Sequence, residues 1–349
     1  MRVVVVGATG NVGTSLLDAL AREPAVESVL GVARRAPTLE VPKVEWAQAD
    51  IAEDDLVPLF RGAGAVVHLA WAIQPSRNLN ALWRVNVHGS TRLLRAVAEA
   101  GVGSLVYASS VGAYSPGPKD RRVDESWPTN GVETSFYARH KAEVERRLDR
   151  FEREAPNVRV VRLRPGLIFK REAAAGIRRL FAGPLFPSPL ARPGAIPFLP
   201  GVPRLRFQAV HSHDAADAYR LAIVGDARGP FNVAAEPVLD PPKLAELLGA
   251  RLVPMSPRAL RTLAGTSWRL HLQPSPPGWV DLGLNVPLLD TTRARDQLGW
   301  TPARGADEAL LDLLEGLREG DGLPTPPLSP ATSGPLRIRE LLTGVGHRT

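Results

Sequence analysis

The chain opens with four valines that lead directly into a glycine-rich turn, Gly7-x-x-Gly10-x-x-Gly13. The continuously apolar, β-branched run 2–6 is typical of a strand that is buried on both faces. Leucines with helical spacing follow the turn as far as Arg22. Such a strand–turn–helix unit can hold the phosphates of a dinucleotide against unpaired N–H groups at the helix N-terminus. The alternative is a turn that only connects a strand to a helix.

Strand and helix patterns alternate along the first half of the chain. We expect strands at 2–6, 29–32, 44–46, 65–69, 104–108 and 158–163, and helices at 14–22, 56–60, 78–100 and 135–154. This alternation predicts an α/β fold with a Rossmann-type, doubly wound parallel sheet. The ligand crevice of such a sheet lies at the carboxyl ends of its strands, which is where the chemistry-bearing residues discussed below fall.

The composition changes after the sixth expected strand, where proline, glycine and apolar residues become frequent. We expect this region to form a smaller, C-terminal substrate-binding domain. It is interrupted by one segment that returns to the sheet. The expected boundaries are 1–165 plus about 207–235 for the dinucleotide-binding domain, 166–206 plus 236–319 for the substrate domain, and 320–349 for a Pro/Gly-rich linker and C-terminal tail, with 320–334 flexible.

Composition excludes several classes of function. The chain has no cysteine, so it has no disulfides or thiolate–metal sites. It has no stretch of about 20 apolar residues, and its arginines are scattered despite a net charge of +7. His68, His211 and His213 lack metal-ligand spacing. We expect a cytoplasmic protein with a small-molecule substrate and no metal, nucleic-acid or membrane partner; whether it forms a homodimer is left open.

The end of the second expected strand bears on the choice of cofactor. An acidic residue there would bind the ribose 2′-OH of NAD, but Ala33 stands in its place and is followed by Arg34 and Arg35. An arginine would bind the 2′-phosphate of NADP with charge-assisted hydrogen bonds. We therefore predict a preference for NADP; the alternative is a solvated arginine and NAD.

Tyr137 and Lys141 are four residues apart and share one face of an expected helix. A nearby ammonium and the positive nicotinamide ring would favour the phenolate and lower the tyrosine pKa from its usual value near 10. Ser110, at the end of the fifth expected strand, would hold the substrate oxygen near Tyr137. An amphipathic surface pair is the alternative for an isolated match of this spacing.

Two polar residues have two interpretations each. Asp50 follows the third expected strand and would either bind the adenine amino group or cap a helix that starts near Glu53. Asn86 lies inside an expected helix, where asparagine is unfavourable. It would either orient water or a backbone carbonyl near Lys141, or make a hydrogen bond within the core.

The chain resembles an extended short-chain dehydrogenase/reductase of the NAD-dependent epimerase/dehydratase family. The matching pieces are Gly7-Ala-Thr-Gly-Asn-Val-Gly13, Asp50-Ile51, His68-Leu-Ala70, Asn86-Val-His-Gly89, Tyr107-Ala-Ser-Ser110, Tyr137-x-x-x-Lys141, Arg164-Pro165, His211-x-x-Asp214 and Leu298-Gly-Trp-Thr-Pro302. The resemblance implies catalytic roles for Ser110, Tyr137 and Lys141. The expected cofactor-binding residues are Gly7, Thr9, Gly10, Asn11, Val12, Gly13, Arg34, Arg35, Asp50, Ile51, Leu69, Ala70, Asn86, Tyr137 and Lys141.

Departures from the family pattern bear on the substrate. No tyrosine-glycine-proline type turn follows Arg164-Pro165, the next segment is strongly apolar, and Trp71 replaces a small residue near the nicotinamide. We predict an NAD(P)-dependent oxidoreductase or epimerase that transfers hydride to or from a carbon bearing a hydroxyl or keto group of a less polar substrate. The alternatives are a nucleotide-sugar epimerase and a non-catalytic NADP-sensing regulator.

Overall fold

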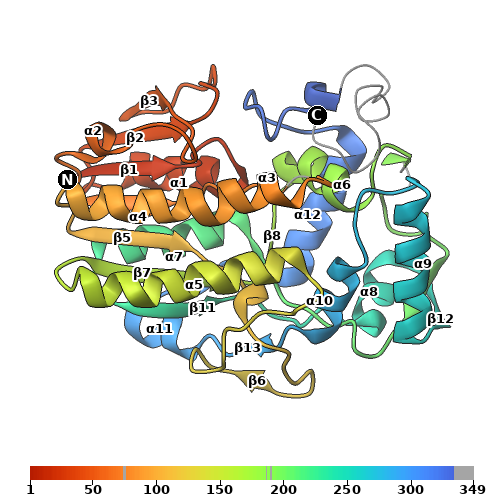
Figure 1. Ribbon diagram of the computed structural model, residues 1–349. Coiled ribbons are helices and arrows are strands. Elements are labelled where there is room, and N and C mark those ends of the chain that lie inside the picture. The colour runs from red at the N-terminus through yellow and green to blue at the C-terminus, as the bar shows by residue number, and fades with distance from the viewer. Residues whose placement is uncertain (74–75, 186, 189–190, 334–349) are drawn as a thin grey trace.

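A seven-stranded parallel sheet forms the centre of the molecule (Figure 1). The computed structural model describes residues 1–73, 76–185, 187–188 and 191–333. The strand order is β11-β7-β5-β4-β1-β2-β3, and every neighbouring pair is parallel. The strands are β1 (Arg2–Val6), β2 (Ser28–Ala33), β3 (Val44–Gln48), β4 (Ala65–His68), β5 (Ser104–Ala108), β7 (Arg159–Pro165) and β11 (Gly229–Val233). This order confirms the predicted Rossmann-type fold.

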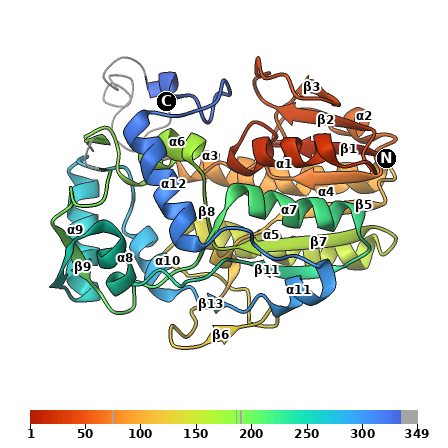
Figure 2. The ribbon, with the colours of Figure 1, turned by 180° about the vertical axis from the view of Figure 1, so that it is seen from behind.

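Helices cover both faces of the sheet. On one face lie α4 (Ser90–Glu99) and α5 (Phe136–Glu154), in front of the sheet in Figure 1. On the other lie α1 (Asn11–Arg22), α7 (Ser212–Val224) and α11 (Thr292–Leu298), which face the viewer in Figure 2. The valines of β1 alternate between the two cores, Val3 and Val5 toward α1 and α7, Val4 and Val6 toward α4 and α5.

The smaller part of the molecule lies beyond the carboxyl ends of the strands (Figure 1). One helix of the region expected to form the substrate domain, α11, instead packs on the core of the sheet through Ala294 and Leu298. The remaining elements are α2 (Val57–Phe60), β6 (Arg122–Val123), β8 (Leu167–Phe169), α6 (Ala174–Phe181), β9 (Phe198–Gly201), β10 (Ala209–His211), α8 (Pro241–Leu248), β12 (Arg251–Pro254), α9 (Pro257–Arg269), α10 (Gly278–Asn285), β13 (Leu288–Leu289) and α12 (Ala306–Glu319), with short 3₁₀ turns at Val111–Ala113, Arg171–Ala173 and Pro330–Ser333.

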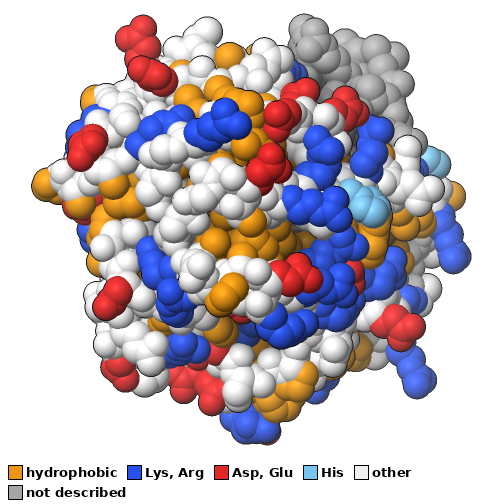
Figure 3. Space-filling model, turned by 60° about the vertical axis from the view of Figure 1, so that its left-hand side comes forward, with side chains coloured by type: hydrophobic (Ala, Val, Ile, Leu, Met, Phe, Trp, Pro, Cys, Tyr) orange, Lys and Arg blue, Asp and Glu red, His pale blue; other side chains and the backbone are white. Residues whose placement is uncertain are grey.

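Acidic and basic side chains are mixed on the face shown in Figure 3. The arginine-rich helix α5 is an example, since Glu143 pairs there with Arg146 and Arg147. Lys and Arg side chains gather on the right-hand part of this face, with a few acidic side chains among them.

The helix expected over 78–100 is not regular throughout. It consists of α3 (Leu79–Trp83), a π-helical segment at Arg84–Gly89, and α4. Within the π-helical segment the Asn86 side chain bonds the backbone of Ala72, and Ser90 Oγ donates to the Asn86 carbonyl at 2.6 Å. Single π-helical turns occur frequently at functional sites.

The expectation of a flexible linker over 320–334 is wrong for the residues described. Thr325 and Leu328 are 1% and 3% exposed. Arg179 donates a hydrogen bond to the Pro327 carbonyl at 2.5 Å, and Arg171 pairs with Asp321 at 2.6 Å. The described part of this segment, up to 333, is therefore held against the protein by buried residues and by hydrogen bonds to Arg171 and Arg179. Residues 334–349, including the expected tail, lie outside the described residues.

A glycine pair tests the packing of α12. A Cβ on Gly316 would lie 2.2 Å from the Arg171 carbonyl oxygen, whereas one on Gly265 would meet nothing nearer than Pro277 at 3.8 Å. Gly316→Ala should lower the free energy of unfolding by about 1–3 kcal/mol through overpacking. Gly265→Ala should leave it unchanged or raise it by up to about 1 kcal/mol. Chemical denaturation measures both, and equal effects would contradict the close contact.

Candidate active site

The glycine turn has the shape of a phosphate cradle. Gly7 has φ +89°, and a Cβ there would lie 2.5 Å from the Ala70 nitrogen. A Cβ on Gly13 would lie 2.5 Å from the Ala8 carbonyl oxygen, but one on Gly10 would meet only the Gly7 carbonyl at 3.5 Å. Packing therefore requires the first and third glycines, and the second leaves the backbone open toward a ligand.

The helix end at this turn is also ready for an anion. α1 begins at Asn11, and its N-cap Gly10 offers no side-chain cap. The Asn11 side-chain nitrogen donates to the Ile168 carbonyl at 3.0 Å, while its buried Oδ1 atom has no partner within the described residues. The open N–H groups fit a phosphate, and the unsatisfied Oδ1 atom fits a hydroxyl or amino donor of the same ligand.

The turn opens into a cavity of about 420 Å³ that reaches the smaller part of the molecule. It brings together most of the residues predicted from the sequence, at the carboxyl ends of the strands. These are Gly7, Thr9, Gly10, Asn11, Val12, Gly13, Arg34, Asp50, Ile51, Leu69, Ala70, Ser110, Tyr137 and Lys141.

Two predicted cofactor residues do not line the cavity. Asn86 is fully buried, and its side chain both accepts from the Ala72 N–H at 2.7 Å and donates to the Ala72 carbonyl at 3.1 Å. It therefore positions the loop after β4, as the core hydrogen-bond interpretation proposed. Arg35 is exposed and does not line the cavity. Its neighbour Arg34 does.

Asp50 lines the cavity but caps no helix near Glu53. Its Oδ1 atom accepts from the Ala52 N–H at 2.9 Å, which is a local turn, and α2 starts at Val57. The capping interpretation is thus wrong, and the side chain stands at the edge of the cofactor half.

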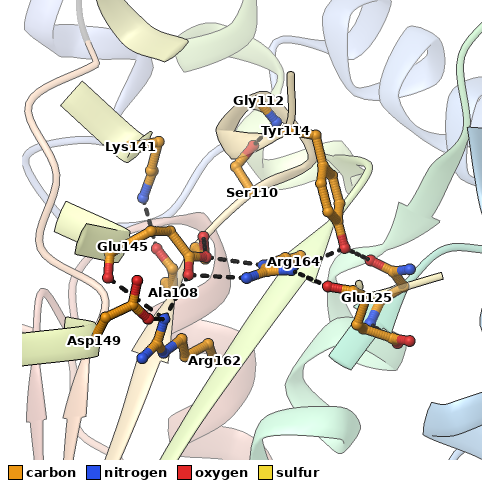
Figure 4. Close-up of polar contacts among 12 residues, drawn as sticks. Ala108, Ser110, Gly112, Tyr114, Glu125, Lys141, Glu145, Asp149, Arg162 and Arg164 are labelled. Carbon is orange, nitrogen blue, oxygen red and sulfur yellow. Dashed lines mark hydrogen bonds and ion pairs between the residues drawn. The ribbon is translucent and has the colours of Figure 1, made fainter. Parts of the chain in front are cut away.

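The three expected catalytic residues lie side by side. Tyr137 and Ser110 are hydrogen-bonded through their side chains, and Ser110 Oγ also accepts from the Gly112 N–H at 3.0 Å. Lys141 Nζ donates to the Ala108 carbonyl at 2.6 Å (Figure 4). α5 presents Tyr137 and Lys141 one turn apart, whereas the end of β5 presents Ser110 and Ala108.

Burial dominates the ionisation of this group. Desolvation raises the pKa of Tyr137 to about 12, although the hydrogen bond with Ser110 opposes the rise. Desolvation also lowers the pKa of Lys141 to about 7, against the attraction of Glu145. The expected lowering of the tyrosine pKa by the lysine is therefore absent from the protein alone, because Lys141 Nζ is 6.0 Å from the tyrosine ring centre and bonds to Ala108.

Aromatic side chains surround the tyrosine. The Trp279 ring lies 5.1 Å from that of Tyr137 and 5.3 Å from that of Phe181, between ring centres. Trp71 approaches Tyr137 edge-on at 6.0 Å, and Lys141 Nζ stands 3.6 Å from the Trp71 ring centre. Trp71 was singled out from the sequence, whereas Phe181 and Trp279 were missed. The apolar content of the segment after Arg164 was a signal for Phe181, and Trp279 had none.

Beyond the catalytic group the cavity is apolar. Its charged lining residues are Arg34, Asp50 and Lys141, all on the cofactor side. The rest of the wall is made largely of Trp71, Ile73, Leu82, Val85, Ile177, Leu180, Phe181, Trp279, Leu282, Pro327 and Leu328. In the described part of the chain no group of three His, Cys, Asp or Glu side chains is placed to hold a metal ion, and no helix there is long and apolar enough to cross a membrane.

A buried charge cluster lies beside Ser110 and Lys141 (Figure 4). Glu145, fully buried on α5, pairs with Arg162 and Arg164 of β7, each at 2.9 Å. Ser109 donates to the same carboxylate at 2.5 Å. Burial by itself would raise the pKa of Glu145, but the two arginines and the serine lower it to about 2. Sequence reasoning missed this cluster.

Replacing this carboxylate should cost stability in a pH-dependent way. Glu145→Gln leaves the buried Arg164 guanidinium without its carboxylate partner, while Arg162 keeps Asp149 and Glu152, so the free energy of unfolding should fall by about 3–5 kcal/mol near neutral pH. Because the pKa is depressed from 4.5 to about 2, the deficit should shrink as pH falls through that window. Denaturation at several pH values measures it. Glu143 is half-buried on α5 and pairs with Arg146 and Arg147 near the surface, so Glu143→Gln should cost less than about 1 kcal/mol. Equal losses would contradict the role of the cluster.

The geometry agrees with comparisons to known proteins. The model of the NAD dependent epimerase/dehydratase family matches residues 3–182. An uncharacterized protein of Mycobacterium tuberculosis is 28% identical over 326 residues, 93% of this chain, which spans 31% of that relative's length. A decarboxylating sterol-4-alpha-carboxylate 3-dehydrogenase of Candida albicans is 24% identical over 279 residues, 76% of this chain and 74% of that protein.

Solved structures share the fold. The UDP-glucose 4-epimerase of Thermus thermophilus, in complex with NAD, superposes with a TM-score of 0.66 at 22% identity, covering 91% of this chain and 99% of that one. With a family model that covers more than half of its residues, the chain belongs to the NAD-dependent epimerase/dehydratase family.

Proposed function

We propose that the protein is an NADP-preferring dehydrogenase or reductase that acts on a secondary alcohol or ketone of a largely apolar molecule. One observation carries the proposal. A tyrosine, a serine and a lysine meet beside a phosphate cradle, and the wall beyond them holds no charged side chain among the described lining residues. The tyrosine, serine and lysine beside the cradle support hydride chemistry. The uncharged wall supports an apolar substrate.

The polarity of the wall argues against a nucleotide sugar. A substrate pyrophosphate carries negative charge that must be met by cations or N–H groups when it leaves water. The cations of the lining, Arg34 and Lys141, lie on the cofactor side, while Trp279, Phe181 and Leu180 face the remaining space. The Candida relative is named as a sterol-4-alpha-carboxylate 3-dehydrogenase, and a sterol is a largely apolar substrate that would fit such a wall.

Tyr137, Ser110 and Lys141 would carry out the proton transfer. With a pKa of about 12, Tyr137 is protonated at neutral pH and, held by Ser110, can donate its proton to a carbonyl oxygen during reduction. Bound NADPH would supply the hydride, and its oxidised form would add a positive ring charge. Lys141, with a pKa of about 7, gains or loses its own charge near neutrality. Oxidation of an alcohol would follow the same steps in reverse. An epimerase would carry out the oxidation and then the reduction.

The cofactor preference rests on one side chain. Arg34 lines the cavity just after β2, and Ala33 gives no carboxylate to repel a 2′-phosphate. Arg34→Ala should therefore weaken NADPH binding about tenfold or more and leave NADH binding nearly unchanged. Arg35→Ala is the matched control and should change neither by much. Titration of the intrinsic tryptophan fluorescence measures the dissociation constants, and unchanged selectivity in Arg34→Ala would refute the NADP assignment.

Removal of one hydroxyl group tests the chemistry. Tyr137→Phe should lower kcat about 10²–10⁴-fold, because it removes the proton donor, while the cofactor dissociation constant stays nearly constant. A panel of apolar cyclic ketones and alcohols against nucleotide sugars identifies the substrate class. Turnover of the nucleotide sugars alone would overturn the apolar assignment, and cofactor binding without any turnover would favour a sensor.

A further inference from the structure

Two long segments of the chain contain no acidic residue. Residues 173–213 hold five arginines, and residues 247–280 hold four, without a single Asp or Glu in either. Both belong mainly to the smaller part of the molecule, which carries α6, β9, β12 and α9.

The same segments carry most of the exposed apolar side chains. The described residues include ten large hydrophobic side chains that are exposed, and all but Leu79 and Leu311 lie in these two segments. Leu263, Leu270 and Leu272 are 59%, 64% and 51% exposed. The others are Phe181, Leu185, Phe198, Leu252 and Val253. α9 contributes no buried residue to the protein, although its apolar and basic residues are segregated.

These side chains belong to one end of the molecule. β9 pairs with β12, which places Phe198 opposite Arg251. Ser275 Oγ donates to the Leu180 carbonyl at 2.6 Å, and a Cβ on Gly183 would lie 2.8 Å from Pro274. In Figures 1 and 2, α9, β9 and β12 lie together at the end farthest from the sheet. We call the exposed residues of the two segments the docking end.

We propose that the docking end binds the surface of a lipid bilayer that contains anionic lipids. A helix with exposed leucines and flanking arginines, free of acidic residues, has the composition of an interfacial helix. Arg251, Arg258 and Arg269 are exposed and would face lipid headgroups, each contributing about 1 kcal/mol near an anionic surface. No membrane partner was expected, because the sequence has no spanning segment, but surface binding requires none.

The charge of the docking end selects this occupant over a second copy of the chain. Two such surfaces facing each other would bring arginines against arginines with no carboxylate from either segment between them. A bilayer bound at the docking end would also lie close to the apolar wall of the cavity. Phe181 is 36% exposed, lines the cavity and touches Trp279, so one exposed residue of the docking end is also part of the cavity wall.

Vesicle sedimentation tests the proposal on the full chain without any need for turnover. Vesicles of phosphatidylcholine with phosphatidylglycerol should pellet the protein, and added salt should weaken the binding. Vesicles of phosphatidylcholine alone should pellet much less. The double variant Leu263→Ser, Leu270→Ser should lose about tenfold or more in partitioning. Leu311→Ser, an exposed leucine on α12, is the matched control and should bind like the wild type. Circular dichroism verifies that each variant is folded.

Three results would overturn the proposal. The first is a protein that stays in the supernatant with anionic vesicles, and the second is a double variant that binds as well as the Leu311→Ser control. The third is a dimer of the wild type, seen by sedimentation velocity, that the double variant dissociates, because the docking end would then be a protein interface. None of these depends on the proposed dehydrogenase activity, so the two proposals fail separately.

Discussion

The buried carboxylate of Glu145 holds together the elements that carry Ser110, Tyr137 and Lys141. It joins α5, which carries the tyrosine and the lysine, to β7 through Arg162 and Arg164, and to the end of β5 through Ser109. Such a cluster is a costly way to gain stability, because three charged groups leave water. Its effect is positional, since a shift of α5 along the sheet would break charge-assisted hydrogen bonds in a medium of low dielectric constant.

The sequence predicted what is encoded locally. The glycine turn, the strand–helix alternation and the four-residue spacing of Tyr137 and Lys141 are each contained in a short segment, and each was found where the pattern placed it. The parallel order of the sheet followed from the alternation, because right-handed crossovers leave few other arrangements. The resemblance to a family drew on the same segments, and most of the cofactor-binding residues that it implied line one cavity.

What was missed depends on contacts between distant segments. Asn86 is read correctly only when the Ala72 backbone is known to lie beside it, and the packing of Leu328 requires the position of α6. Trp279 comes from a region with no recognisable pattern, yet it covers the tyrosine ring. The proline- and glycine-rich composition after 320 suggested a flexible linker. Composition indicates how freely the backbone can move, but it does not show whether a surface is available to bury the few apolar residues present.

Burial shifts the ionisation of Tyr137 and Lys141 in opposite directions, and each shift favours the neutral form. Trp71 contacts both groups, and Trp279 covers the tyrosine ring. An apolar substrate would exclude the remaining water and strengthen both shifts, whereas a nucleotide sugar would bring charge and water into the same space and weaken them. The protonated phenol is thus maintained by the same wall that would select the substrate. Under the proposed function, preference for an apolar ketone and retention of the phenol proton at neutral pH would share one physical cause, the desolvation of this corner of the cavity.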